Sequence, residues 1–275
     1  MTYNLEFVKI SNEHEFAGVG FAGNIFIILN ALTHIGDDDF MYVDMGKNEC
    51  ACSEKNTTLY DTKNCWEYYF NQTRLIPGEN NTTLNSLLPA NIGYEDRNIF
   101  MYPENFTILK NKFYRNFQLK DHVKEIIDNF YNDKIKDKKT LGVQVRLTDM
   151  KHYHNVSPVE SYLNKVKEIL HINKEIDQIF LSTDDSTVIP IFEKEISVPI
   201  VYYTDMFRAN NDTPHLHPYD RFKSDRDLHR YKIGLECLQE ILTLSKCDYL
   251  FKADVSSISI VGVILSENIK QVYKL

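Results

Sequence analysis

The sequence predicts an α/β protein built on a doubly wound parallel sheet. In the second half of the chain, short runs of branched and aromatic residues alternate with longer stretches whose apolar residues recur at helical spacing. In the first half, an apolar segment, a glycine-rich turn, a helical pattern and a second apolar segment follow one another. Because strands that alternate with helices are joined by crossovers, they are expected to pair in parallel.

The first 135 residues are predicted to form an N-terminal domain. In chain order we expect a strand at 5–10, a glycine-rich turn at 18–24, a helix at 25–35, a strand at 40–43, irregular structure with short helices at 46–95, and a helix at 121–131.

A charged connector at 132–139 leads into a predicted C-terminal domain, residues 136–275. Ser157 and Pro158 are placed to open its first helix as N-cap and first-turn residue. In chain order we expect a strand at 140–146, a helix at 158–170, a strand at 177–182, a helix at 186–194, a strand at 198–203, a polar loop from 205 to about 226, a helix at 228–245, a strand at 248–251, a helix at 257–266 and a strand at 269–273.

Composition narrows the class of protein. The chain has 275 residues, 43% hydrophobic and 25% charged, which is typical of a globular protein with a substantial core. Its net charge is −8 and no long block of lysine or arginine occurs, which argues against a nucleic-acid partner. No apolar run approaches about 18 residues, and the N-terminus does not read as a signal peptide. We therefore expect a cytoplasmic protein with no transmembrane segment.

Five cysteines, an odd number, are expected to be free thiols in a reducing compartment. Cys50, Cys52 and Cys65 could ligate zinc, but a fourth ligand at zinc-finger spacing is missing. No metal site is predicted.

The segment Leu141–Asp149 (LGVQVRLTD) carries the main functional signal. Its alternating apolar residues end in Arg146, Thr148 and Asp149, which is typical of a buried parallel strand with polar groups at its carboxyl end. Ligands of open α/β sheets bind at that edge, and an arginine there can hold a phosphate with two hydrogen bonds. A surface arginine paired with a nearby acid explains the pattern equally well.

Other segments add candidates. Gly20 and Phe21 belong to a glycine-rich turn that either lets a ligand approach the backbone or forms a tight turn with positive φ. In Ser182–Asp185 (STDD), Asp185 is expected to cap the following helix, and Asp184 is kept as a ligand contact.

The region from Glu240 to Ser257 is the strongest C-terminal signal. Glu240 lies beside the apolar stripe of a helix. Its carboxylate suits the adjacent N1 and N2 donors of guanine, although an exposed glutamate is the simpler interpretation. Ser256 or Ser257 either binds a phosphate at a helix N-terminus or serves as an ordinary N-cap. His152 and His154 follow the Arg146 strand, where a histidine could deprotonate an acceptor hydroxyl.

These segments together resemble the α-1,6-fucosyltransferase family, which includes the bacterial nodulation fucosyltransferases. The resemblance spans residues 18–70 and 140–265. The family's Gly-x-Gly-aromatic, Trp-Glu-x-x-Phe and His-Val-Arg-Arg-Thr-Asp motifs are similar to 18–21 (GVGF), 66–70 (WEYYF) and 144–149 (QVRLTD). Its later motifs, Pro-x-Glu-x-Tyr, Ala-Thr-Asp-Asp and a carboxylate before Leu-Ser-x-x-Asp and Ser-Ser, are similar to 158–162, 182–185 and 240–257.

The resemblance implies a glycosyltransferase B-type fold, with two Rossmann-like domains and a cleft between them. Residues 1–135 would serve the glycan acceptor and residues 136–275 the nucleotide sugar. It implies an inverting, metal-independent transfer of a sugar, L-fucose from GDP-fucose, to a glycan hydroxyl without a cofactor. Arg146 would hold the β-phosphate with help from Ser257, and Glu240 would recognise guanine.

The chain departs from the motif at two contacts: Gln144 replaces a histidine and Leu147 replaces the second arginine. The family's glutamate base falls near His152–His154, which makes His154 the candidate base. Two alternatives stay open: a transferase that uses another nucleotide sugar, and a catalytically weak protein that binds nucleotides or glycans.

Overall fold

The computed structural model describes residues 2–6, 20–46, 52–54, 59–72, 82–85, 104–148, 157–209, 224–253 and 256–275. The chain divides into two compact units. Unit 1 comprises Met1–Lys124 and Arg226–Leu235, and unit 2 comprises Glu125–Asp225 and Glu236–Leu275. The predicted domain boundary between residues 135 and 136 stays a prediction.

Unit 1 contains a parallel sheet in the order β2-β1-β4, formed by β1 (Thr2–Glu6), β2 (Phe40–Asp44) and β4 (Thr82–Asn85). Helix α1 (Phe21–Leu32) comes between β1 and β2 in the chain, which confirms the predicted strand, helix and strand. The helix begins four residues earlier than expected because Phe21 and Ala22 are already buried. Residues 7–10 of the predicted first strand lie outside the described part.

An aromatic cluster forms a second part of unit 1. Trp66 stacks on Phe70 at 4.2 Å between ring centroids and meets the edges of Phe113 and Phe117. Two of the elements that supply these rings, α2 and β5, were not predicted from the sequence. The cluster draws on η1 (Cys65–Tyr68), β3 (Phe70–Gln72), α2 (Glu104–Asn116) and β5 (Phe117–Leu119), with β3 and β5 antiparallel.

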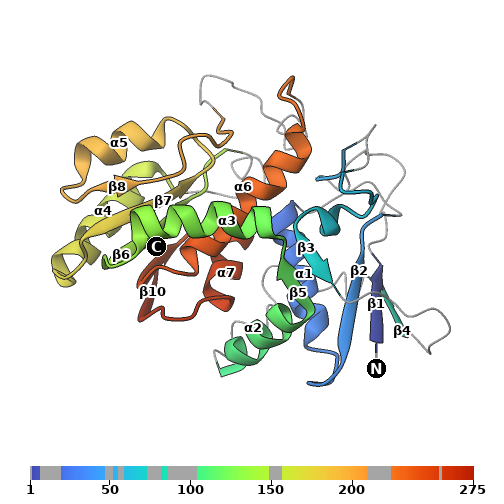
Figure 1. Ribbon diagram of the computed structural model, residues 1–275. Helices are drawn as coiled ribbons and strands as arrows, with labels where there is room; N and C mark the ends of the chain where they lie inside the picture. Colours follow the sequence, from blue (N-terminus) through green and yellow to red (C-terminus); the bar gives the residue numbers. More distant parts are fainter. Residues whose placement is uncertain are drawn as a thin grey trace. The chain divides into compact units, whose positions relative to one another are not determined.

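Unit 2 is built on a five-stranded sheet in the order β10-β9-β6-β7-β8, and every strand pair is parallel (Figure 1). The predicted doubly wound sheet is therefore confirmed. Strand β8 is only two residues long, much shorter than the predicted 198–203. The strands are β6 (Thr140–Val145), β7 (Gln178–Thr183), β8 (Ile200–Val201), β9 (Tyr249–Lys252) and β10 (Gln271–Lys274).

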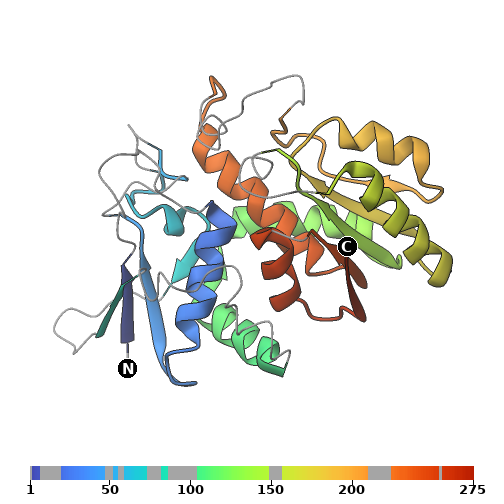
Figure 2. The same cartoon turned by 180° about the vertical axis from the view of Figure 1, so that it is seen from behind.

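Helices cover both faces of this sheet (Figure 2). Leu141, Val143 and Val145 point to one face, where they share a core with α4 (Val159–Ile172) and α5 (Val188–Glu195). The alternate residues of β6 point to the other face, since Gly142 lies against Leu244 of α6 (His229–Leu244). Helix α7 (Ser257–Ile264) packs on this second face as well, with Gly262 next to Leu244 and Leu250.

Two predicted boundaries were wrong in detail. The expected connector at 132–139 is helical up to Ile135, because α3 (Asp121–Phe130) continues into a π-helical turn (Tyr131–Ile135) that buries Ile135. Helix α4 has Pro158 as N-cap, one residue later than predicted, and no side chain caps it.

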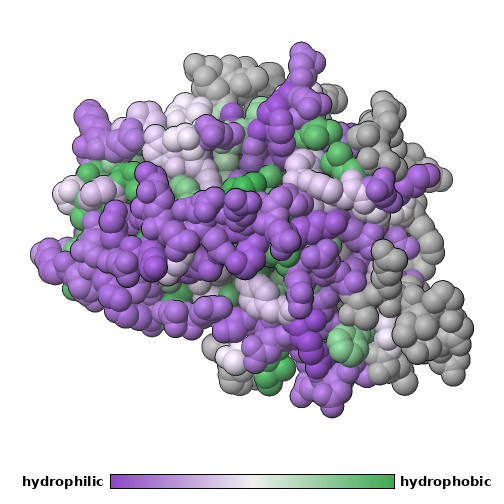
Figure 3. All heavy atoms as spheres, viewed as in Figure 1, coloured by the Kyte–Doolittle hydropathy of each residue, from purple (hydrophilic) through white to green (hydrophobic). Residues whose placement is uncertain are grey.

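On the face shown in Figure 3, hydrophilic side chains gather over α3, where Glu125 and Asn129 are exposed.

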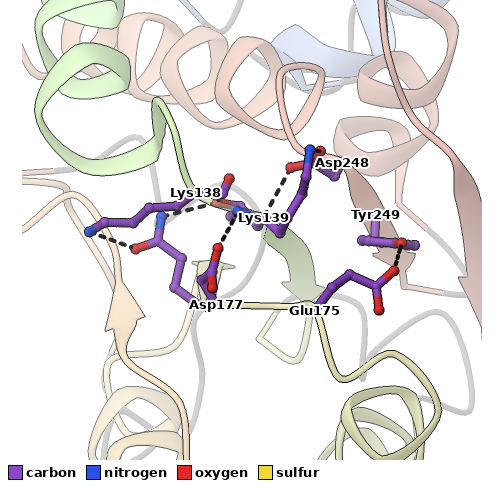
Figure 4. A network of polar contacts seen from close by, with 8 residues as sticks. Lys138, Lys139, Glu175, Asp177, Asp248 and Tyr249 are labelled. Atoms are coloured by element: carbon purple, nitrogen blue, oxygen red, sulfur yellow. Dashed lines mark hydrogen bonds and ion pairs between the residues drawn. The ribbon is translucent and has the colours of Figure 1, made fainter.

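The amino edge of the unit 2 sheet is held by a polar network (Figure 4). Lys139 Nζ lies 2.9 Å from Asp248 Oδ1, and the other oxygen of Asp248 accepts a hydrogen bond from the Thr140 amide at 3.0 Å. The Lys139 amide donates to Asp177 at 2.7 Å. The side chains at this edge therefore bind one another and fix the starts of β6, β7 and β9.

Candidate functional site at the carboxyl edge of the unit 2 sheet

The strand order places a topological switch point between β6 and β9. The chain leaves β6 through α4 on one face of the sheet and leaves β9 through α7 on the other. The two connections diverge at the carboxyl ends of these neighbouring strands, which is where open α/β sheets bind ligands. Arg146 directly follows β6, and Ser256 opens α7 shortly after β9.

Arg146 forms an ion pair with Asp184, which directly follows β7. Arg146 Nε lies 3.3 Å from Asp184 Oδ2, and the side chains are 13% and 8% exposed. The sequence also allowed a surface arginine paired with a nearby acid. The acidic partner is present, but the arginine side chain is mostly buried and keeps some exposure to solvent. A guanidinium has five N–H donors, so one carboxylate contact through Nε is compatible with binding a second anion.

The Asp184 carboxylate also binds the segment that carries Arg146. It accepts hydrogen bonds from the amides of Leu147 at 3.1 Å and Thr148 at 3.3 Å, and from the Thr148 hydroxyl. These contacts fix the turn that leaves β6. They make Asp184 a positioning residue for Arg146, and its predicted direct contact with a nucleotide sugar stays a prediction.

Asp185 binds the start of helix α5, as the sequence indicated. Its Oδ1 accepts hydrogen bonds from the amide and the hydroxyl of Thr187, at 2.9 and 2.7 Å. The residue is fully buried.

Glu240 is buried, so the interpretation of this residue as an exposed helical glutamate was wrong. It is 9% exposed and lies on α6, on the sheet face that also receives Gly142. One turn along the helix, the Thr243 hydroxyl bonds the Tyr203 hydroxyl at 2.9 Å. Burial raises the pKa of Tyr203, and the negative charge of Glu240 raises it further. A buried carboxylate is costly unless hydrogen bonds or ion pairs compensate it, and ionisable groups in such positions are frequent at binding sites.

The N-terminus of α7 lies at the same edge. Ser256 is the N-cap and is 6% exposed, but its side chain makes no capping hydrogen bond to the helix. Ser256 is therefore not the ordinary side-chain cap that the sequence also allowed. Ser257 is the first helical residue and is half-buried.

In unit 1, Gly20 and Phe21 do not form the predicted tight turn. Gly20 has φ −58°, which any residue adopts, and no atom lies within 4 Å of the position of a Cβ there. Phe21 is 3% exposed, and its ring packs 4.7 Å from Tyr69 and 5.9 Å from Trp66. The Phe21 ring is thus a core side chain, and a ligand contact by either residue stays a prediction.

Two of the predicted site residues, Asp149 and His154, lie outside the described residues, as do His152 and positions 210–223 of the polar loop. Cys52, Cys65, Cys237 and Cys247 are free and buried. Within the described ranges, no group of three His, Cys, Asp or Glu side chains is arranged to hold a metal ion. No helix in those ranges is long and apolar enough to cross a membrane.

The sequence did not single out Ser182, Tyr203 or Thr243, although each carries a hydroxyl group in unit 2. Ser182 stands in the run Gln178–Thr183 (QIFLST), where it occupies a fully buried position next to Gln144 in the neighbouring strand. A polar residue at the alternate buried position of an otherwise apolar strand is the signal that could have found it.

Comparison with known proteins supports the fold. No family model matches the sequence, and no curated protein matches it. Among solved structures, the NodZ α-1,6-fucosyltransferase co-crystallised with GDP aligns with a TM-score of 0.58 at 12% identity, covering 97% of this chain and 93% of that one. The same enzyme soaked with GDP-fucose aligns with a TM-score of 0.57 at 13% identity over the same shares.

The fucosyltransferase NodZ from Bradyrhizobium aligns with a TM-score of 0.57 at 12% identity, covering 95% of this chain and 92% of that one. The alignments extend over nearly the whole of both chains. This protein therefore has the fold of the NodZ fucosyltransferases.

Proposed function

We propose that this protein is an inverting, metal-independent glycosyltransferase that moves L-fucose from GDP-fucose to a hydroxyl group of a glycan. The observation that carries the proposal is the position of Arg146, a partly exposed cation held by Asp184 at the switch point of a doubly wound sheet. The fold shared with NodZ, which has been crystallised with GDP and GDP-fucose, supports this donor. It also supports a glycosyltransferase B-type arrangement of two Rossmann-like domains, with residues 1–135 on the acceptor side.

Arg146 would bind the diphosphate of the donor. Arginine pairs with phosphate through two parallel N–H···O bonds, and the pair is strongest where water is largely excluded. The N-terminus of α7 adds amide donors and a partial positive charge, with the hydroxyls of Ser256 and Ser257 close by. These groups would together neutralise the leaving diphosphate.

Glu240 and Gln144 would recognise the base. The carboxylate of Glu240 suits the exocyclic amino donor of guanine, next to N1–H, and its burial on α6 favours this role over contact with solvent. Gln144 is 1% exposed, at the position where the fucosyltransferase motif has a histidine.

In the proposed reaction the acceptor hydroxyl attacks the anomeric carbon of fucose from the side opposite the diphosphate. The new C–O bond forms as the bond to the β-phosphate oxygen breaks, which inverts the anomeric centre. His154 would remove the hydroxyl proton, and Asp149 would assist. Arg146 and the helix terminus would stabilise the charge that develops on the diphosphate.

A binding protein with little catalytic power is the second candidate, because Leu147 stands where the motif has a second arginine. A transferase for another nucleotide sugar is a third. Calorimetric titration with GDP, UDP and GDP-fucose, followed by an assay for release and transfer of labelled fucose, distinguishes the three. We expect GDP to bind more tightly than UDP and labelled fucose to be transferred. Tight GDP binding without turnover would identify a binding protein.

A further inference from the structure

Oδ2 of Asp185, just after β7, is buried and makes no hydrogen bond, and two more buried oxygens without one lie within β6 and β7. The latter two are Oε1 of Gln144 and Oγ of Ser182, and the residues are 1% and 0% exposed. Gln144 and Ser182 are direct partners in the parallel register of β6 and β7. The two unpartnered atoms therefore lie on adjacent strands at the same level of the sheet.

Both side chains point to the face of the sheet that α6 covers. On β6, Gln144 alternates with Val143 and Val145, which belong to the core under α4 and α5. On β7, Ser182 likewise alternates with Leu181, which belongs to the same core. Arg146 and Asp184 come two residues later in the chain, just past the ends of the same two strands, so the pair lies next to their ion pair.

The polar side chains at the opposite edge of the sheet do make hydrogen bonds. There, Lys139, Asp177 and Asp248 bind one another and the ends of the strands. Buried polar groups without partners lower the stability of the fold, and a functional role is one of the reasons for which proteins keep them. Gln144 and Ser182 lie opposite each other on neighbouring strands, yet these two atoms do not bond each other.

We infer that Ser182 and Gln144 together read the edge of the donor base on which a ring N–H stands beside a carbonyl oxygen. The inference rests on the proposed function and adds Ser182 as a specificity-determining residue. The Gln144 oxygen accepts the ring N–H, and the Ser182 hydroxyl donates to the carbonyl. Guanine and uracil present this edge, whereas adenine presents an amino donor beside a ring acceptor.

Glu240 would then distinguish guanine from uracil. Gln144 takes N1–H of guanine, which leaves the exocyclic amino group for the Glu240 carboxylate. Ser182 sets this chain apart from the fucosyltransferase motif, which has alanine at the corresponding position. A hydroxyl has thus been placed beside the residue that replaces the motif's histidine.

The test compares Ser182→Ala with the wild-type protein for binding of GDP, inosine diphosphate and inorganic pyrophosphate. We expect Ser182→Ala to weaken GDP and inosine diphosphate equally, by roughly three- to tenfold, the effect of one neutral hydrogen bond. Pyrophosphate has no base, so its affinity should not change. The melting temperature should stay the same or rise, because the lost hydroxyl has no partner in the folded chain.

Ser245→Ala is the matched control. Ser245, directly after α6, is also a buried serine, but its hydroxyl donates to Leu242 O of that helix at 2.8 Å. This variant should lower the melting temperature and leave GDP affinity unchanged. Gln144→Met, which keeps the volume and removes the acceptor, should repeat the pattern of Ser182→Ala.

The outcomes separate this inference from the proposed function. Unchanged GDP affinity in Ser182→Ala, together with a large loss in Arg146→Ala, overturns the role of Ser182 and leaves the transferase proposal standing. Equal losses for GDP and pyrophosphate also overturn it, since the serine would then act on the phosphates. A wild-type protein that binds neither GDP nor pyrophosphate overturns both.

Discussion

The Nε atom of Arg146 lies 3.3 Å from a carboxylate oxygen of Asp184, and each residue directly follows one of two neighbouring parallel strands. The same carboxylate binds the amides of the two residues after Arg146. One acid therefore fixes both the side chain of the arginine and the backbone that carries it. Such a cation needs little rearrangement when an anion arrives, which is the property of an efficient electrostatic site.

Replacing Arg146 with alanine should weaken GDP binding by about 1.5–3 kcal/mol, because a charge-assisted contact with phosphate is lost. Arg146→Lys should recover part of the loss, since lysine keeps the charge but not the two-pronged geometry. Isothermal titration calorimetry of the three proteins measures the effect. Unchanged GDP affinity in the alanine variant would remove Arg146 from the phosphate site.

Asp184→Ala should destabilise the fold by about 3–5 kcal/mol, because it leaves a largely buried guanidinium and two amides without their acceptor. Asp184→Asn, which keeps one acceptor oxygen, should cost less. Guanidinium chloride unfolding gives both values. The asparagine variant should also bind GDP more weakly than the wild type while it remains folded, and equal affinity would show that Arg146 needs no positioning.

Glu240→Gln should reduce GDP affinity by about 1.5–3 kcal/mol, the range for a hydrogen bond to a charged group. Inosine diphosphate lacks the exocyclic amino group of guanine, so its affinity should change little. Competition binding with the two nucleotides on the wild type and the variant tests this. A loss of the same size for both nucleotides contradicts the assignment of Glu240 to the amino group.

His122 should make the stability of unit 1 depend on pH. Its Nε2 lies 3.0 Å from the Tyr231 hydroxyl and 3.2 Å from the Tyr60 hydroxyl. Burial lowers the pKa of His122 below its usual 6.5, and the charge of Lys120 lowers it further. The unfolded chain therefore takes up the proton first as pH falls. The free energy of unfolding should decrease below about pH 6.5 until His122 is protonated in the folded state too.

The measurement is urea unfolding of the wild type and His122→Gln between about pH 7.5 and 5, within the titration range of histidine. Other groups titrate in both proteins, so the difference between the curves isolates His122. The wild type should lose more stability than the variant across this range. Parallel curves would show that His122 does not contribute.

Gly234→Ala should destabilise the protein by about 1–3 kcal/mol through overpacking. A Cβ at this position would lie 2.2 Å from the Tyr69 hydroxyl oxygen and 3.0 Å from Cys52 Sγ. The clash would also disturb the 2.9 Å hydrogen bond from Tyr69 to Tyr231 O. Thermal unfolding measures the effect.

Gly20→Ala is the control for Gly234→Ala, because no atom lies near the position of its Cβ and its φ of −58° suits alanine. Its melting temperature should equal that of the wild type. Any loss of donor binding in this variant would then come from a ligand that approaches the backbone at Gly20.

The sheet of unit 2 could be predicted because its strands and helices each carry a local pattern. Val143 and Val145 alternate, and the five strands of the observed sheet correspond to the five predicted ones. Helix α2 and strand β5 were not predicted because these elements are stabilised by packing against residues that are distant in the sequence. Phe113 and Phe117 pack on Trp66, which is far away in the chain.

Site residues could be predicted where a charged side chain directly follows an apolar strand pattern, as Arg146 does. It was not predictable where the role of a side chain depends on the neighbouring strand. Asp184 was predicted to contact a ligand, and the structure shows that its carboxylate forms an ion pair with Arg146 on the neighbouring segment. Ser182 gave only a weak signal, a polar residue at a buried strand position, and only the register with Gln144 shows that two buried oxygens lie together.

The contact between Tyr69 and Gly234 also offers a way to recognise distant relatives. At 12% identity to NodZ, pairwise alignment carries little information, but a steric constraint survives any amount of divergence around it. A homologue with a tyrosine at the first position is expected to keep glycine at the second, and a larger residue at the second position should occur with a smaller side chain at the first. Correlated change at these two positions, 165 residues apart, would mark chains that share this packing even where no motif can be aligned.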